Sequence, residues 1–268
     1  MLAQIQPAAL DFRLEPQIAA SKLASLLDDV RERGGVESYV DALRNKHQVF
    51  AAALPERRPD SLPGEVTQVL LECVFPARRK LAEPLKGLEQ VHFAGAILEL
   101  VYSKGSILER MRDFCDKLPV SGRKQEGAAW DLAAEILHFR FPELLPLMTR
   151  WVWDSQTMSG AVREFVAGAD TVQSLPLEVS PEGLEGVRAW FVEHLEASGF
   201  YRDLPFITDL ILARGYADYM DSISGSLGIF KSEFGGQQDP MDMVVKLLGI
   251  DERRNTRPAR NAPSLPLH

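Results

Sequence analysis

Cysteine is scarce in this sequence, and the two cysteines present lie far apart. Cys73 and Cys115 are the only two among 268 residues, and neither belongs to a CxxC pair or a cysteine–histidine cluster. A disulfide-stapled scaffold, a structural zinc site and a thioredoxin-like redox motif are therefore not indicated. We expect two buried structural thiols, because free cysteine is among the most buried residue types. A disulfide between them stays open.

Long apolar runs are absent as well. The longest stretch without a charged residue is residues 1–10, which is too short to cross a bilayer. These residues carry no Lys or Arg ahead of an apolar stretch, so a secretory signal is not indicated. We therefore expect a soluble cytoplasmic protein with no membrane contact.

Positive charge is also in deficit, since 30 Lys and Arg face 38 Asp and Glu. An acidic balance repels phosphate backbones and argues against broad nucleic-acid binding. Local basic clusters still occur at 78–80 and between Lys104 and Lys124, where acidic residues interrupt the second cluster. Such interleaving is typical of a solvated helix face.

Seven residues within the second cluster, LPVSGRK at 118–124, stand between two predicted helices. They are similar to the hairpin of helix-hairpin-helix DNA glycosylases. The family's hairpin has two glycines where this one has Gly122 alone, and its catalytic Asp comes sooner after the hairpin than Asp154 does here. We therefore do not assign the protein to that family.

Helical patterns fill most of the chain. Hydrophobic residues make up 46% of the sequence and charged residues 25%, which is enough apolar material for a globular core. Apolar residues recur at helical spacing between proline and glycine stops, as in the segment from Pro16 to Gly34. The one convincing alternation is at 175–179. The sequence predicts an all-α bundle of about ten helices with at most one short strand.

The protein is expected to form one helical domain over residues 1–250, with a possible subdivision near 170–180. Residues 251–268 contain three prolines and four arginines and little to bury, which predicts a flexible, disordered Arg/Pro-rich tail. The glycine-rich segment at 222–240 and this tail are both candidates to order on a partner.

The segment 128–154 carries the most distinctive side chains. Asp131, Glu135 and His138 fall at i, i+4 and i+7 of a predicted helix, so they lie along one side of it. Glu135 and His138 also have the Glu-x-x-His spacing of one helix of a di-metal bundle. The structural alternative is a core histidine hydrogen-bonded to a carboxylate or carbonyl.

A short second helix from Pro142 is expected to complete a helical hairpin over Asp131–Asp154. It would carry Arg150, Trp151, Trp153 and Asp154. The two aromatic rings could line a pocket, with Arg150 binding a carboxylate or phosphate. The structural alternative is two core tryptophans beside an Arg150–Asp154 helix pair.

Standard catalytic and cofactor motifs are missing. The sequence has no G-x-S-x-G and no G-x-x-x-x-G-K-[ST], and neither cysteine neighbours a histidine. No cofactor is predicted, and Glu135 and His138 are the only candidates for a metal. Whether the protein is an enzyme stays open.

Three hypotheses follow. The first is a non-enzymatic accessory protein, meaning an adaptor, chaperone or assembly factor, that works through contacts with another protein. The second is an enzyme or metal protein with its site on the Asp131–Asp154 hairpin. The third, disfavoured by the acidic balance, is a nucleic-acid binder that uses a local basic face.

Overall fold

The structure is a computed structural model that describes residues 4–168, 174–227 and 239–251, with residues 223–227 described by backbone alone. Ten α-helices make up most of this part of the protein, which confirms the all-α prediction. They are α1 (Pro16–Val30), α2 (Gly35–Ala53), α3 (Gly64–Glu72), α4 (Phe75–Lys80), α5 (Gln90–Tyr102), α6 (Ile107–Asp116), α7 (Arg123–Arg140), α8 (Pro181–Ala197), α9 (Leu204–Leu227) and α11 (Pro240–Leu247).

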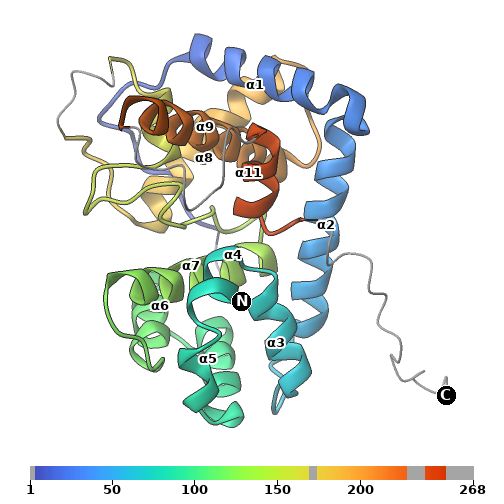
Figure 1. The fold of residues 1–268 in the computed structure, drawn as a ribbon, viewed down its shortest axis with the longest axis vertical. Coiled ribbons are helices and arrows are strands. Elements are labelled where there is room, and N and C mark those ends of the chain that lie inside the picture. Colours follow the sequence, from blue (N-terminus) through green and yellow to red (C-terminus); the bar gives the residue numbers. More distant parts are fainter. Residues whose placement is uncertain (1–3, 169–173, 228–238, 252–268) are drawn as a thin grey trace.

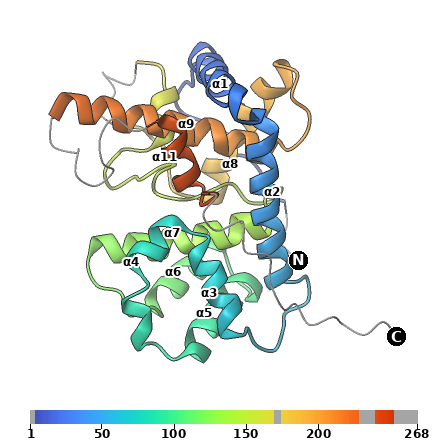
Figure 2. The ribbon, with the colours of Figure 1, turned by 45° about the vertical axis from the view of Figure 1, so that its right-hand side comes forward.

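The helices fall into two groups with α2 running along both (Figure 1). α3 to α7 form one group, while α1, α8, α9 and α11 form the other, together with the short 3₁₀ helix η3 (Ala161–Phe165). α7 lies at the boundary, where it packs against α2, α4 and α6 (Figure 2). The residues that α7 presents to the second group therefore help α2 to join the two.

Capping residues set several of the helix ends. Ser106 and Glu109 form a capping box at the start of α6, because each side chain bonds to the other's backbone N–H. The Ser180 side chain accepts from the backbone N–H of Gly183 at the start of α8. Gly34 adopts a φ of 92° between α1 and α2, a conformation that favours glycine.

Arg110 fastens α6 to the end of α5. Its side chain is buried, and its guanidinium donates hydrogen bonds to the backbone carbonyls of Leu100 and Val101. The last carbonyls of a helix have no partner within that helix. Arg110 supplies that partner, so it belongs to the structural frame rather than to a basic surface.

The prediction of a second helix in the 131–154 hairpin is wrong. Residues 142–154 form turns, and most side chains between Leu145 and Trp153 are buried rather than only those on one helical face. Pro142 and Pro146 lack the backbone N–H groups that would continue a helix. The expected Arg150–Asp154 helix pair is absent too, because Asp154 instead accepts hydrogen bonds from the backbone N–H groups of Gln156 and Thr157.

Gly215 lies within a continuous helix. α9 runs unbroken from Leu204 to Leu227, and an added Cβ at Gly215 would lie 2.7 Å from Phe165 Cε2. The glycine therefore permits the close approach of α9 to η3.

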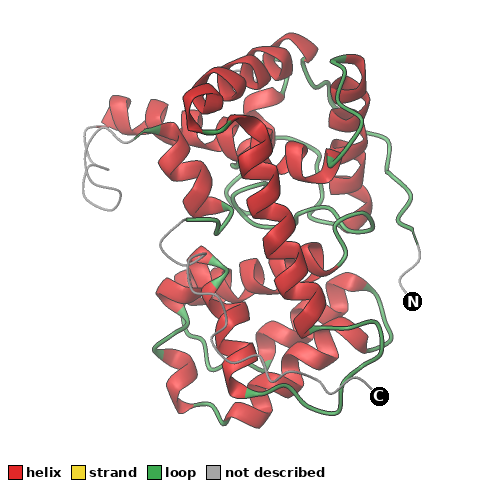
Figure 3. Cartoon of the chain, turned by 90° about the vertical axis from the view of Figure 1, so that its right-hand side faces the viewer, coloured by secondary structure: helices red, strands yellow, loops and turns green. Residues whose placement is uncertain are grey.

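The described residues pair as strands only at two isolated bridges, Leu14–Val166 and Asp154–Ser159, so the segment 175–179 is an extended connector (Figure 3). Within the same part of the protein, no helix combines the length and apolar character needed to cross a bilayer. The predicted tail beyond residue 251 and most of the 222–240 segment lie outside the described residues. The possible subdivision near 170–180 stays a prediction.

Candidate functional site

Asp131, Glu135 and His138 all lie on the buried side of α7. Their spacing places them on one face of the helix, as predicted. That face contacts segments that are distant from α7 in the sequence. We call these three residues the polar seam. Each of them is paired with a partner of its own.

Glu135 is paired with Lys46 of α2. Lys46 Nζ lies 2.6 Å from Glu135 Oε2 and 2.6 Å from the carbonyl oxygen of Leu248, just past α11. The ammonium also lies 4.0 Å from the centroid of the Phe139 ring. Burial raises the pKa of Glu135, while Lys46 acts in the opposite direction. This contact joins three helices that are distant in the sequence.

His138 is fully buried and uses both of its ring nitrogens. Nδ1 lies 2.8 Å from the carbonyl oxygen of Leu145, to which it must donate, and Nε2 lies 2.8 Å from Asp209 Oδ2 on α9. Both ring nitrogens are thus engaged in hydrogen bonds within the core. The ring therefore has no free nitrogen with which to bind a metal.

Asp131 holds Arg150 in place. Its Oδ1 accepts from the backbone N–H of Arg150 at 2.8 Å, and its Oδ2 accepts from Nη2 at 3.2 Å. The guanidinium lies against α7 at Gly127, where an added Cβ would be 1.9 Å from Arg150 Cζ. Burial raises the pKa of Asp131, against the lowering effect of Arg150.

The polar seam is thus a set of buried contacts between α7 and the rest of the molecule. Glu135 and His138 are enclosed in these contacts rather than open to a cavity. Among the residues that the structure describes, no three His, Cys, Asp or Glu side chains gather as they would around a metal ion.

The basic clusters noted in the sequence are partly used within the fold. Arg78 makes a two-pronged contact with Asp251, with distances of 3.0 and 2.9 Å. Arg110 is buried under the end of α5. These two cations are therefore not available to a phosphate backbone.

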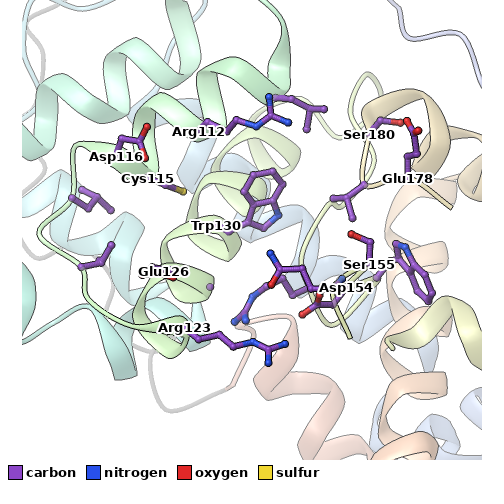
Figure 4. A pocket seen from close by; sticks show the side chains of 18 of the residues that line it. Arg112, Cys115, Asp116, Arg123, Glu126, Trp130, Asp154, Ser155, Glu178 and Ser180 are labelled. Atoms are coloured by element: carbon purple, nitrogen blue, oxygen red, sulfur yellow. The ribbon is translucent and has the colours of Figure 1, made fainter. Parts of the chain in front are cut away.

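Beside the seam lies a cleft of about 910 Å³ (Figure 4). One wall comes from α6, the turn after it and the first turns of α7, and the other comes from residues 150–156 and 177–180. Trp130 projects between these walls in the close-up, with Arg112 and Asp116 on one side and Glu178 and Ser180 on the other.

The lining of the cleft mixes apolar surface with charges of both signs. Its apolar residues are Leu108, Leu118, Val120, Trp130, Trp153, Leu177 and Val179. Its cationic residues are Arg112, Arg123 and Arg150, and its acidic residues are Asp116, Glu126, Asp154 and Glu178. Such a surface suits a ligand that has an apolar body and more than one polar group.

Three of the seven predicted site residues line this cleft, namely Arg150, Trp153 and Asp154. Asp131 lies behind Arg150 and positions it. Trp151 is buried elsewhere, with its ring 6.1 Å from that of Tyr216 between centroids. Trp153 also holds the far wall, because its indole N–H donates to the carbonyl of Leu177 at 2.9 Å.

Sequence reasoning missed the other side of the cleft. Arg112, Arg123, Glu126 and Trp130 all line it. Helical periodicity assigns Trp130 to the core stripe of α7, and the interleaved charges indicate a solvated face. No local signal marks the cleft, because it forms only when residues 150–156 and 177–180 come to lie opposite α6 and α7.

Both cysteines are free, so they form no disulfide, and both are partly exposed, so the expected burial of the two thiols is wrong. Cys115 lines the cleft, and burial raises the pKa of its thiol to about 12. Burial also raises the pKa of Cys73. A thiol with a raised pKa is a poor nucleophile at neutral pH, because the thiolate is the reactive form.

Comparison with protein-family models, with curated proteins and with solved structures found no match to this protein. Its function is therefore inferred from the cleft and the residues around it.

Proposed function

We propose that the protein is a non-enzymatic accessory protein (an adaptor, chaperone or assembly factor) that binds a segment of another protein in the cleft. The observation that carries this proposal is the lining, in which apolar side chains alternate with three arginines and four carboxylates. A polypeptide segment offers the matching surface, since it has apolar side chains, charges of both signs and a polar backbone.

The size of the cleft supports the same reading. A volume of about 910 Å³ lies near the upper end of the usual range for ligand pockets, which is roughly 300 to 1,000 Å³. The space is therefore sufficient for several residues of an extended peptide, and its two walls come from separate parts of the molecule.

The chemistry of the lining favours binding over nucleophilic catalysis. The Cys115 thiol has a pKa of about 12, and the Ser180 hydroxyl accepts the N–H of Gly183 at the start of α8. The residues that line the cleft include no histidine to serve as a base for either group. Neither Cys115 nor Ser180 is therefore paired with a histidine base, which is the arrangement that activates such nucleophiles.

The enzyme or metal hypothesis can no longer rest on Glu135 and His138, but the cleft could still hold a catalytic site. Glu135 and His138 are engaged in the polar seam. A catalytic role would have to use the lining carboxylates Asp116, Glu126, Asp154 or Glu178.

The cytoplasm remains the expected compartment.

The nucleic-acid hypothesis has one observation in its favour. Gly122, with a φ of 77°, precedes α7 and leaves its first backbone N–H groups uncapped, and Arg123 and Lys124 are exposed in the first turn. A positive helix end beside two cations can bind a phosphate. The acidic lining opposes it, and undetectable binding of an oligonucleotide at low salt would end this hypothesis.

The proposal is tested first by photocrosslinking from Ser155, which is exposed and lines the cleft. A crosslinker at Ser155 is compared in the native host with one at Val91, which is 66% exposed on α5 and lies outside the cleft. We expect a partner peptide captured from Ser155 and absent from Val91. Capture alone is not sufficient, so the captured sequence is then synthesised and titrated into the purified protein.

The decisive comparison uses two tryptophan substitutions. Ser155→Trp fills the cleft, whereas Ser21→Trp adds the same bulk at an exposed position of α1 away from it. The peptide should bind the wild type and Ser21→Trp equally and lose at least tenfold in affinity with Ser155→Trp. Equal binding to both variants, or capture of a small molecule or oligonucleotide instead, would contradict the proposal.

A further inference from the structure

We propose that Arg150 is the anchor for a carboxylate group of the segment bound in the cleft. This inference rests on the proposed function and names the chemistry of its ligand. Its first support is that Arg150 lines the cleft with its side chain one-third exposed.

Arg150 is held ready before any ligand arrives. Its backbone N–H and Nη2 both donate to the buried carboxylate of Asp131. Its guanidinium also lies in a space that exists only because residue 127 is glycine. A free arginine side chain loses conformational entropy when it is fixed, because many rotamers are given up. Here the fold itself has already ordered the side chain.

The guanidinium still has hydrogen-bonding capacity to offer. Of its three nitrogens, only Nη2 donates to Asp131, at 3.2 Å, and Nε has no partner although it is buried. Guanidinium groups bind planar two-oxygen anions with particular strength, because two parallel N–H groups match the two oxygens. An anion that enters the cleft can bind the exposed part of the guanidinium, whereas the buried Nε becomes available only if the side chain shifts.

The charges around Arg150 favour a singly charged anion over a doubly charged one. The cleft is lined by three arginines against four carboxylates, so its formal balance is one negative charge. A phosphate, with close to two negative charges at neutral pH, meets more repulsion there than a carboxylate does. The carboxylate can come from the C-terminus of the bound segment or from one of its Asp or Glu side chains.

Gly127 provides a substitution that displaces the anchor and preserves the helix. In Gly127→Ala the new Cβ would lie 1.9 Å from Arg150 Cζ, so the guanidinium must move, while alanine is a better helix former than glycine. Gly95→Ala in α5 is the matched control, because an added Cβ there meets nothing within 4 Å. The two variants make the same chemical change in a helix interior, and only one disturbs Arg150.

The experiment titrates four probes into ¹⁵N-labelled protein at constant ionic strength. The probes are N-acetyl-leucyl-leucine as the free acid, the same dipeptide as its C-terminal amide, N-acetyl-leucyl-aspartyl amide and inorganic phosphate. The Nε–H signal of Arg150 reports the anchor. The indole N–H signal of Trp130, which donates to the carbonyl of Met148 at 2.9 Å, reports occupation of the cleft.

We expect both carboxylate probes to shift the Arg150 and Trp130 signals saturably, and the amide and phosphate to bind at least tenfold more weakly. The comparison between the two carboxylate probes tells a peptide terminus from an acidic side chain. Gly127→Ala should lower the affinity for the carboxylates at least tenfold and leave that for the amide unchanged. Gly95→Ala should match the wild type.

Three outcomes would overturn the anchor. They are equal binding of acid and amide, unchanged carboxylate binding in Gly127→Ala, and no shift of Arg150 with any carboxylate. If the dipeptide acid and its amide shift the Trp130 signal equally, the cleft binds peptide without a carboxylate anchor. That outcome supports the proposed function and contradicts the role of Arg150. If the crosslinking from Ser155 fails as well, the proposed function falls with it.

Discussion

The pair formed by Lys46 and Glu135 should behave as a unit, so that losing one partner costs far more than losing both. The two side chains are almost completely buried and lie 2.6 Å apart. We consider Lys46→Met, Glu135→Leu and the double variant, which replaces the pair by apolar groups of similar length. The free energy of unfolding of each is compared with that of the wild type.

The expected sizes follow from what each change leaves behind. Lys46→Met leaves a buried carboxyl group without its cation, and Glu135→Leu leaves a buried ammonium, so each should cost about 3–5 kcal/mol. The double variant leaves only the carbonyl of Leu248 without its donor, which costs about 1–3 kcal/mol. The sum of the two single losses should therefore exceed the double loss by at least about 3 kcal/mol.

The pH dependence of Lys46→Met gives an independent check. Burial already raises the pKa of Glu135, and removal of the cation raises it further. Above the ordinary value of 4.5, the folded variant holds a proton that the unfolded state releases. Its free energy of unfolding should thus fall as the pH rises above 4.5 toward the raised pKa of the folded variant, by up to about 1.4 kcal/mol per pH unit. The double variant has no carboxyl group there and should show no such fall.

Urea unfolding followed by the fluorescence of the four tryptophans measures these energies. Lys86→Met is the control, because Lys86 and its partner Glu83 are 70% and 82% exposed, so that loss should stay below about 1 kcal/mol. If the loss in free energy of unfolding of the double variant equals the sum of the two single losses, Lys46 and Glu135 do not interact as a buried pair.

Three further predictions concern polar contacts that the fold depends on. Asp209→Ala should lower the free energy of unfolding by about 1–3 kcal/mol in urea unfolding, because His138 Nε2 is left buried without its partner; an unchanged free energy would contradict the contact. Arg110→Met should lower the free energy of unfolding by about 2–4 kcal/mol in urea unfolding, because two carbonyls at the end of α5 lose their donors. A loss below about 1 kcal/mol would show that water takes the place of the guanidinium as their donor. The hydrogen bonds from Ser106 lower the pKa of Glu109, so this contact stabilises α6 above the ordinary value of 4.5 and is lost as the pH falls through the lower folded value. In Ser106→Ala the NMR titration midpoint of the Glu109 carboxyl should move up toward 4.5, since the backbone bond alone remains, and an unmoved midpoint would rule out the hydroxyl as a cause.

The helices could be predicted because their signals are local. Gly34, Ser180 and Asp239 begin or end helices through their own backbone and side-chain chemistry, which the sequence displays directly. The pattern over 142–154 predicts a helix where the structure has turns, because apolar spacing alone does not distinguish a helix from a buried irregular segment. There the decisive contacts are non-local, as in the bond between His138 and the carbonyl of Leu145.

The candidate site was half predictable for the same reason. The placement of Asp131, Glu135 and His138 on one face follows from helical geometry. Their partners follow from nothing local, since Lys46 is 89 residues from Glu135 and Asp209 is 71 residues from His138. Prediction of the cleft would have required the packing of residues 150–156 and 177–180 opposite α6 and α7, which no periodicity encodes.

The bond between Lys46 and the carbonyl of Leu248 also sets an order of events while the protein is being made. The two residues are 202 positions apart. At the usual rate of synthesis of roughly 5–20 residues per second, Lys46 waits about 10–40 s for this acceptor to emerge from the ribosome. Even Glu135, 89 positions after Lys46, follows only after about 4–18 s. Until α7 and the residues after α11 have been made, the nascent polypeptide leaves exposed the side of α2 that they cover. A chaperone that binds newly made proteins would therefore meet this side of α2 before α7 does.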